Sequence, residues 1–188
     1  MLQDPDVLPG GKDAVTAHTR LWVHETFRVF GDRLTDKTDQ EWLLKQLKEI
    51  IPKHFEGQDF DKTMAHIDMD SDGVVDLDDT RRCLFGSYLN PDAGDPDNDD
   101  APPRKYTEVT DVTGLISLME EYLIDYNGMS KRPMNLAMFL FATEHISRVA
   151  RVLQQPGGHM LLVGVGGSGR QSLTRVAAHI SRMEVFQV

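Results

Sequence analysis

Apolar residues recur every three or four positions through much of the chain, which is the spacing of amphipathic helices. Two such stripes occupy the first third of the sequence. Asp13 is placed to cap the first helix, and Thr38 with Glu41 forms a capping box that opens a second helix before Pro52. We expect these two helices to pack together as a hairpin. The two stripes consist of Val23, Phe27, Phe30 and Leu34, followed by Trp42, Leu43, Leu47 and Ile50.

Two further helices are predicted in the second half of the chain. One starts near Val112 and is expected to stop at Asn127 and Gly128, a pair that favours a left-handed cap. Pro133 then suits the start of a longer helix over residues 136–153. The stripe of the first of these helices consists of Leu115, Ile116, Met119, Tyr122, Leu123 and Tyr126.

Near the C-terminus the helical spacing gives way to a continuous apolar run, Met160 to Val163. Such a run is typical of a strand buried on both faces of a parallel sheet. A helical stripe follows it, and Val185 to Val188 has the composition of a second strand. The pattern therefore predicts one βαβ unit that stops in its second strand. The helical stripe consists of Leu173, Val176, Ala177 and Ile180.

A glycine-rich loop joins the first predicted strand to that helix. Successive backbone N–H groups of such a loop converge on a phosphate group, and the N-terminus of the helix adds the positive end of its dipole. We therefore expect ATP or ADP to bind here. The candidate binding residues are Gly164, Val165, Gly166, Gly167, Ser168, Gly169, Arg170, Gln171 and Ser172.

This loop departs from the phosphate-binding template G-x-x-x-x-G-K-[ST] at two positions. Arg170 takes the place of the lysine, and Gln171 takes the place of the hydroxyl that binds Mg²⁺. An arginine still offers a permanent positive charge, so binding can survive, whereas a neutral amide makes hydrolysis doubtful. Ser172 lies about 100° further round the helix. The alternative is a strand-to-helix turn that holds no ligand.

A second motif, residues 68–79, has the form of an EF-hand calcium loop. Carboxylates stand at loop positions 1, 3, 5 and 9, a glycine allows the sharp bend at position 6, and position 7 offers its carbonyl group. A hard cation, Ca²⁺ or Mg²⁺, prefers such oxygen ligands. The candidate ligands are Asp68, Asp70, Asp72, Val74, Asp76 and Asp79.

The residues around this loop support the hypothesis in part. Phe60, Met64 and Ile67 mark one face of an incoming helix, and Cys83 with Leu84 gives an apolar step on an outgoing one. At position 12, however, Asp79 stands where a bidentate glutamate is expected, which favours weak Ca²⁺ or the smaller Mg²⁺. No second loop is visible. The alternative is a solvated acidic turn between two helices.

The formal net charge of −10 is concentrated between Asp59 and Asp111. This excess disfavours nucleic acid and other polyanions as direct partners. Within the segment, residues 90–103 are rich in Asp, Pro and Gly, which predicts a mobile linker. The single cysteine, the lack of a secretory signal and the lack of a long apolar stretch favour a soluble intracellular protein without a membrane span.

Several stretches of the chain resemble axonemal dynein heavy chains. The carriers of this resemblance are Val163-Gly-Val-Gly-Gly-Ser-Gly-Arg-Gln-Ser-Leu-Thr-Arg175, Glu144-His-Ile-Ser-Arg148, Val185-Phe-Gln-Val188, Tyr126-Asn-Gly-Met-Ser-Lys-Arg-Pro-Met134, Phe85-Gly-Ser-Tyr-Leu-Asn-Pro91, Leu21-Trp-Val-His-Glu25 and Arg28-Val-Phe-Gly-Asp-Arg-Leu34. Even the arginine and glutamine of the glycine loop look like that family. The resemblance covers most of the chain except its acidic middle.

By this resemblance, the chain runs from the helical lid of the third AAA+ module into the start of the fourth. The fold class implied is mainly α with a partial α/β P-loop unit at the C-terminus. The expected organisation is a lid-like segment at 1–57, an EF-hand-like helix–loop–helix at 58–91, an acidic linker at 92–105 and the N-terminal part of a P-loop module at 106–188. Arg28 would be a lid arginine that senses nucleotide in the preceding module, or else part of an ion pair on the helix surface.

The resemblance also implies a function in an ATP-dependent microtubule motor of the cilium or flagellum, with the axoneme, cytoskeleton and cytoplasm as its location. The partners implied are neighbouring AAA+ modules and other dynein chains, with the microtubule bound only through other parts of the motor. Because the Walker B strand and sensor residues of the family are not found, we expect no useful ATP hydrolysis by this chain alone. The alternatives are a calcium-responsive regulatory module and a structural spacer.

Overall fold

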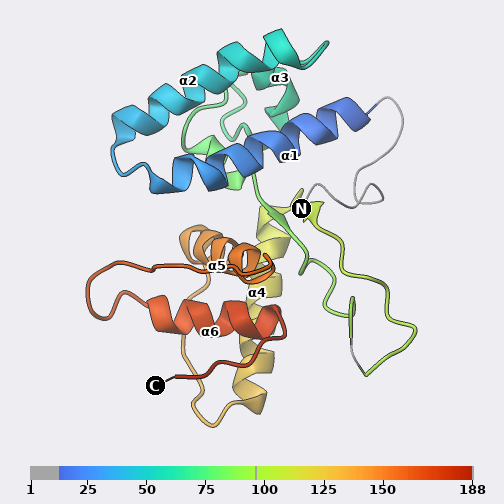
Figure 1. The fold of residues 1–188 in the computed structure, drawn as a ribbon, viewed down its shortest axis with the longest axis vertical. Coiled ribbons are helices and arrows are strands. Elements are labelled where there is room, and N and C mark those ends of the chain that lie inside the picture. The colour runs from blue at the N-terminus through green and yellow to red at the C-terminus, as the bar shows by residue number, and fades with distance from the viewer. Residues whose placement is uncertain (1–12, 96, 188) are drawn as a thin grey trace. The chain divides into compact units, whose positions relative to one another are not determined.

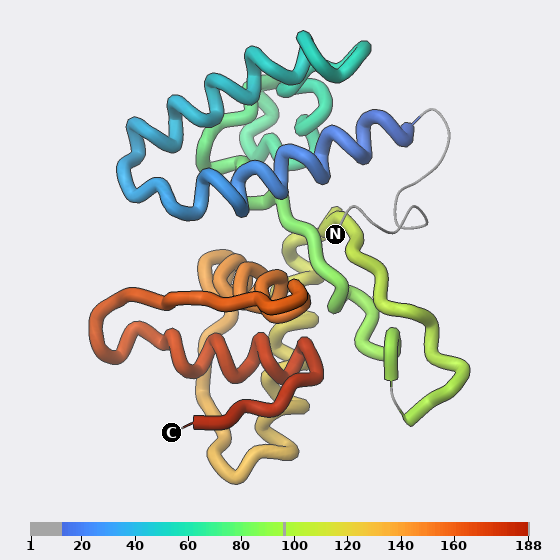
Figure 2. Tube along the Cα trace, in the orientation of Figure 1, coloured from blue at the N-terminus to red at the C-terminus, as the bar shows by residue number. Residues whose placement is uncertain are grey.

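The computed structural model of the chain describes residues 13–95 and 97–187. It is mostly helical, as the hydrophobic spacing predicts, and it divides into two compact units that meet in the sequence between Phe85 and Gly86. The chain can be followed through both units by colour in Figure 2. Among the described helices, none is both long and apolar enough to cross a membrane.

The first unit is built on two helices, α1 (Ala14–Val29) and α2 (Lys37–His54), joined by the 3-10 turn η2 (Gly31–Arg33). Asp13 precedes α1 but makes no side-chain cap. The cap of α2 is Asp36, whose Oδ1 accepts a hydrogen bond from Thr38 N at 2.8 Å, and not the predicted Thr38. The short side chain of Asp36 reaches this free N–H because its backbone is extended and lies just ahead of the helix.

The buried face of α2 is rotated from the predicted stripe. Leu43, Leu44, Leu47 and Ile51 are buried, whereas Trp42 is 60% exposed. Phe30, predicted on the stripe of α1, is 58% exposed because α1 ends at Val29. The helix α3 (Phe60–Thr63) contacts both α1 and α2, and it brings the fully buried Phe60 into the core of this unit (Figure 1).

The acidic loop is flanked by single helical turns and not by the longer helices expected of an EF-hand. The incoming side consists of α3 and the 3-10 turn η3 (Ala65–Ile67), and the outgoing side is the 3-10 turn η4 (Asp79–Arg82). The apolar residues that suggested longer helices are nevertheless buried: Phe60, Met64, Ile67, Cys83 and Leu84. The hydrophobic pattern therefore predicted correctly which side chains are buried, but it did not predict the length of the helices.

The second unit contains α4 (Val112–Met129), α5 (Leu140–Leu153) and α6 (Arg170–Ile180), with α6 in contact with both other helices. Met119, Ile146, Val176, Ala177 and Ile180 are buried between them. The only sheet among the described residues pairs two-residue strands, β1 (Phe85–Gly86) and β2 (Thr107–Glu108).

The ends of α4 and α5 differ from the prediction. No left-handed cap forms at Asn127 and Gly128, because α4 continues to Met129 and ends at Ser130 in an extended conformation. Asn127 instead uses its side chain to hold the next segment: Nδ2 donates to Met134 O at 2.8 Å, and Met134 N donates to Oδ1 at 2.7 Å. This segment delays the start of α5 to Leu140, after the predicted position 136.

The acidic stretch 90–103, predicted to be a mobile linker, makes hydrogen bonds to the rest of the second unit at several points. Arg104 donates from Nε to Ala93 O and from Nη1 to Ile180 O, and Arg182 donates to the carbonyl oxygens of Gly94 and Pro91. Ala93 is buried. Composition alone missed this arrangement because the arginines that fix the stretch lie outside it in the sequence.

The two strands predicted around the glycine loop are not paired in a sheet among the described residues. Leu161 is 88% exposed, Val163 is 83% exposed and Phe186 is 89% exposed. A strand is stabilised by hydrogen bonds to a neighbouring strand, and neither 160–163 nor 185–187 has one. The predicted strand–loop–helix order is kept only in its loop and in α6.

Candidate functional site

The glycine loop has the backbone conformation that its sequence requires. Gly167 and Gly169 both have φ = +80°, and Gly169 is the N-cap residue of α6. Side chains rarely adopt this left-handed region, so glycine at these two positions is a conformational requirement. The loop is exposed, and the first N–H groups of α6 have no partner within the helix.

Arg170 spans this loop with its side chain. Nη1 donates to Leu162 O at 3.3 Å and Nη2 donates to Val165 O at 3.0 Å, so the guanidinium group joins the two sides of the loop. A methyl group added to Gly164 would lie 3.4 Å from Arg170 Cδ, which shows how closely the arginine stem passes. The positive charge of Arg170 is therefore held against the loop by hydrogen bonds to nearby residues of the same segment.

The other two helical residues of the candidate site differ in their exposure. Gln171 is exposed, and Ser172 is half-buried. Arg170 and Gln171 line a hollow of about 460 Å³, whose described lining contains no acidic residue. The structure thus combines positive charge with main-chain donors, and it places no carboxylate in the hollow beside them.

The acidic loop brings together three of its six predicted ligands. Carboxylate oxygens of Asp68, Asp70 and Asp72 all lie within 4.8 Å of one another. Asp68 also folds the loop around itself, because Oδ1 accepts from Ser71 N and Oδ2 accepts from Gly73 N, each at 2.9 Å. Gly73 takes φ = +83°, in agreement with the sharp bend expected at this position.

Asp76 and Asp79 form a reciprocal capping pair at the start of η4. Asp79 N donates to Asp76 Oδ1 at 3.0 Å, and Asp76 N donates to Asp79 Oδ2 at 2.9 Å. The second oxygen of Asp79 accepts from Met69 N at 3.1 Å, and Asp79 is buried. Both oxygens of the residue at loop position 12 are therefore bonded to the backbone. The spacing of a short capping box could have revealed this role from the sequence.

A group that the sequence analysis did not single out supports the loop from outside. Asp61 Oδ1 accepts from the backbone N–H of the buried Val75 at 2.9 Å and from Lys48 Nζ at 2.7 Å. Val75 is the eighth of the twelve residues of the loop. No local motif links residues 48, 61 and 75, so only the fold shows this support.

The pKa values of two carboxyl groups in the loop are shifted in opposite directions. The backbone N–H of Asp72 lowers the pKa of Asp70, but the neighbouring Asp72 and Asp68 charges with slight desolvation outweigh it, so the pKa is raised overall. The backbone N–H of Asp79 is the largest cause that lowers the pKa of Asp76. Mutual repulsion in the cluster is what a bound cation would relieve.

Arg28, near the end of α1, makes an ion pair with the turn that follows the helix. Its Nη2 lies 3.2 Å from Asp32 Oδ1 in η2, and its side chain is 8% exposed. The ion pair of the predicted alternative is therefore present, but it is largely buried, and the nucleotide-sensing role stays a prediction.

Two family models match separate parts of the chain. Residues 12–66 match the AAA+ lid domain, and residues 134–188 match the P-loop containing dynein motor region D4. The first match covers α1 and α2, and the second covers α5, the glycine loop and α6. The chain is therefore built from parts of AAA+ modules.

Curated relatives agree with these matches over almost the whole chain. Over 94% of its own length, the chain is 42% identical to mouse dynein axonemal heavy chain 12. Over 90% of its own length, it is 42% identical to mouse dynein axonemal heavy chain 3. It is 40% identical to human dynein axonemal heavy chain 2 over 94%. The chain spans only 6%, 4% and 3% of these proteins, respectively.

The chain belongs to the axonemal dynein heavy chain family and corresponds to a stretch of its AAA+ motor region. This confirms the resemblance carried by the glycine loop and the segments before it.

Proposed function

We propose that this chain contributes a regulatory nucleotide site to a dynein heavy chain, in which ATP or ADP is bound through residues 164–172. The observation that carries the proposal is the paired left-handed conformation of Gly167 and Gly169 at the N-terminus of α6. A glycine turn of this kind ahead of a helix suits a phosphate, because main-chain N–H groups and the positive end of the helix dipole both favour an anion in front of the helix.

The proposed site binds nucleotide without efficient hydrolysis. Gln171 offers only a neutral amide at the position of the Mg²⁺-binding hydroxyl, and the hollow beside the loop has no acidic residue in its described lining. A water molecule would therefore lack a base to activate it. Arg170 would leave its two carbonyl partners and turn toward the phosphates, where a guanidinium can form two parallel hydrogen bonds.

Titration of the chain with a fluorescent ADP analogue tests this proposal. Gly169→Ala should weaken binding about tenfold or more, because alanine disfavours φ = +80° and disturbs the phosphate-binding turn. Gly157→Ala is the matched control, since Gly157 also has a positive φ of 64° and open space around it, but lies outside the loop. Equal affinities of both variants and the unmodified chain would overturn the proposal.

We also propose that the acidic loop binds Ca²⁺ or Mg²⁺ with modest affinity. The convergence of Asp68, Asp70 and Asp72 supports the site, with the Val74 carbonyl group as a further ligand. Asp76 and Asp79 would have to exchange backbone hydrogen bonds for the ion, which reduces the affinity. A bound divalent cation would neutralise the repulsion among the three clustered carboxylates.

Melting temperatures measured with and without a divalent cation test the cation site. Asp70→Asn should raise the melting temperature slightly without cation, because it removes repulsion, and should abolish the rise caused by millimolar Ca²⁺ or Mg²⁺. Asp78→Asn is the control, because it removes an exposed charge outside the cluster and should keep the cation effect. No cation-dependent rise in the unmodified chain would contradict the proposal and favour a solvated turn.

At the level of the whole protein, we propose a part in an ATP-dependent microtubule motor of the axoneme in a cilium or flagellum. Neighbouring AAA+ modules and other dynein chains would be its partners, while nucleic acid and membrane are not. The names of the relatives support this assignment. A structural spacer without ligands is the competing function, and the two titrations above distinguish it.

A further inference from the structure

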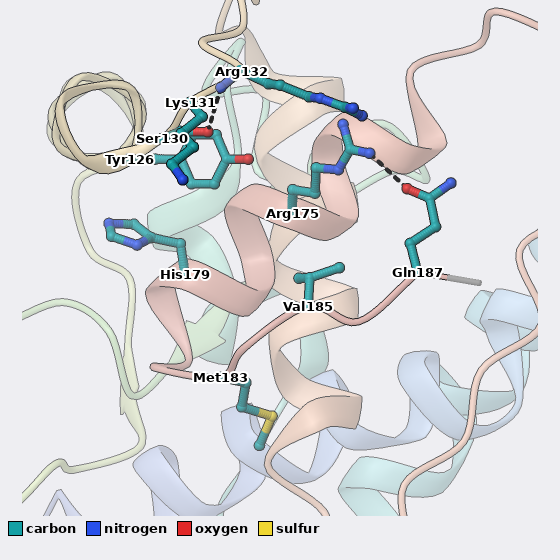
Figure 3. Close-up of a pocket in the computed structure, with 9 residues that line it drawn as sticks. All are labelled: Tyr126, Ser130, Lys131, Arg132, Arg175, His179, Met183, Val185 and Gln187. Atoms are coloured by element: carbon teal, nitrogen blue, oxygen red, sulfur yellow. Dashed lines mark hydrogen bonds between the residues drawn. The ribbon is translucent and has the colours of Figure 1, made fainter.

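A second concave site lies in the same unit as the glycine loop but along a different part of α6. It has a volume of about 380 Å³ and lies between the end of α4, the second half of α6 and the segment that follows it (Figure 3). Its volume falls in the range of small-molecule sites. No residue from 164 to 172 lines it, although Arg175, Val185 and Gln187 also line the hollow beside the glycine loop.

The charge of this pocket is opposite to that of the chain. Lys131, Arg132 and Arg175 line it, and its described lining contains no acidic residue, whereas the chain as a whole has a formal net charge of −10. Figure 3 shows that the first two come from the loop after α4 and the third from α6. Three cations from two elements repel one another unless an anion lies between them.

The loop that carries Lys131 and Arg132 is held in place. Ser130 N donates to Tyr126 O at 2.9 Å, Arg132 N donates to Ser130 Oγ at 3.1 Å, and the Asn127 amide bonds to the backbone of Met134 on the far side. Because this backbone is already ordered, a ligand that binds here would lose little free energy by ordering it.

The opposite wall is equally constrained, and it is partly apolar. Arg175 Nη2 donates to Gln187 Oε1 at 2.8 Å, which leaves its other nitrogens for a ligand. His179 bonds to Asp125 Oδ2 at 2.9 Å and meets the ring of Tyr126 edge-on at 5.6 Å. Met183 and Val185 complete the lining.

We propose that this pocket binds a small phosphate-bearing molecule, at a position that does not involve residues 164–172 of the glycine loop. Two planar guanidinium groups and one ammonium group offer several N–H donors and three positive charges, which suit the oxygens of a phosphate. The Tyr126 ring and the apolar side chains suit an organic body attached to that phosphate.

Pyrophosphate is the probe for the first test, with nuclear magnetic resonance of the full chain as the readout. We expect shifts of the backbone signals at residues 126–132 and 179–183, and of the side-chain N–H signals of Arg132, because these parts of the pocket do not line the hollow beside the glycine loop. Shifts confined to residues 162–175 and 185–187 would show that pyrophosphate binds only beside the glycine loop, and would overturn the proposal. The absence of any shift would overturn it as well.

Calorimetry with charge variants provides the second test. The double variant Lys131→Glu with Arg132→Glu should weaken pyrophosphate binding at this site about tenfold or more, because two attractive contacts become repulsive. Arg175→Gln, on the other wall, should weaken it independently and guards against misfolding of the double variant. Lys105→Glu makes the same charge change at an exposed position of the same unit, outside the pocket, and should change the affinity less than about twofold.

A dicarboxylate tests the ligand class. Malonate carries two negative charges but lacks the phosphate oxygens, so we expect clearly weaker binding than for pyrophosphate. Equal affinity for the two anions would overturn the assignment to phosphate. An unchanged affinity in both the double variant and Arg175→Gln would overturn the site itself.

Discussion

The acidic loop and the glycine loop use their polar groups in opposite ways. In residues 68–79, carboxylates accept hydrogen bonds from backbone N–H groups of the same loop, at Ser71, Gly73, Val74 and Asp76 among others. In residues 164–169, the described backbone bonds within the loop reduce to one long contact, Ser168 N to Val165 O at 3.4 Å. The first loop therefore stabilises its own fold, whereas the second leaves its donors for a ligand.

This difference predicts that changes around the acidic loop alter stability, and that changes in the glycine loop alter binding. The largest effect is expected from Phe60→Ala, because Phe60, in α3 ahead of the acidic loop, is 1% exposed. Loss of a buried phenyl group costs about 3–5 kcal/mol. Urea denaturation should show this loss in the first unit, while ADP binding at the glycine loop persists. A loss of ADP binding at urea concentrations that leave the second unit folded would contradict the independence of the two loops.

A smaller loss is expected from Asp61→Ala. This substitution leaves the buried Val75 N–H without its acceptor and removes the partner of Lys48, at a cost of about 1–3 kcal/mol. The exposed Asp78→Ala has the same change in charge and should cost less than about 0.5 kcal/mol. Chemical denaturation of the two variants in parallel measures the difference. Equal costs would show that Asp61 does not support the loop.

The third comparison concerns the glycine loop. Arg170→Ala should change the free energy of unfolding by less than about 0.5 kcal/mol, because its donors serve exposed carbonyl groups. The same variant should weaken ADP binding strongly. Thermal denaturation with and without ADP separates the two effects. A large loss of stability without ligand would show that the arginine is a structural clamp.

The smallest effects are expected from pH, with opposite signs at two carboxylates. The lowered pKa of Asp76 gives stability above pH 3.8 that is lost as pH falls through the folded value, so Asp76→Asn should lower the melting temperature only at higher pH. The raised pKa of Asp70 means that its charge destabilises the fold above that pKa, and Asp70→Asn should raise the melting temperature at neutral pH.

Both differences should vanish as pH falls, for Asp70→Asn near its reference pKa of 3.8 and for Asp76→Asn below it. Melting curves of the two variants between neutral and acidic pH provide the measurement. Shifts of the same sign would contradict the assigned causes.

Features that depend on neighbouring residues in the sequence were predicted well. The stripe of α6 was confirmed by the burial of Val176, Ala177 and Ile180, and glycine at position 73 was confirmed by its positive φ. Helix ends were less predictable, because Asn127 found its partner in Met134 and so did not end α4. The support of Val75 by Asp61 and Lys48 depends on contacts between distant residues, which no local pattern contains.

The strands around the glycine loop show a different limit. Hydrophobicity at 160–163 and 185–187 indicates residues suited to a buried sheet, but it does not supply the hydrogen-bonding partner that defines a strand. These side chains are exposed in the second unit. The sequence thus identified two segments suited to strands, but whether they pair depends on a neighbouring strand, which the local pattern does not contain.

The two arginines that fasten residues 91–94 have a mechanical consequence. Arg104 donates to Ile180 O, the last carbonyl of α6, and Arg182 lies two residues after the end of that helix. A helix of 11 residues is a rod about 16 Å long. A displacement of the glycine end of α6 along the helix axis is therefore transmitted to the backbone of residues 91–94, which moves together with the C-terminal end of the helix.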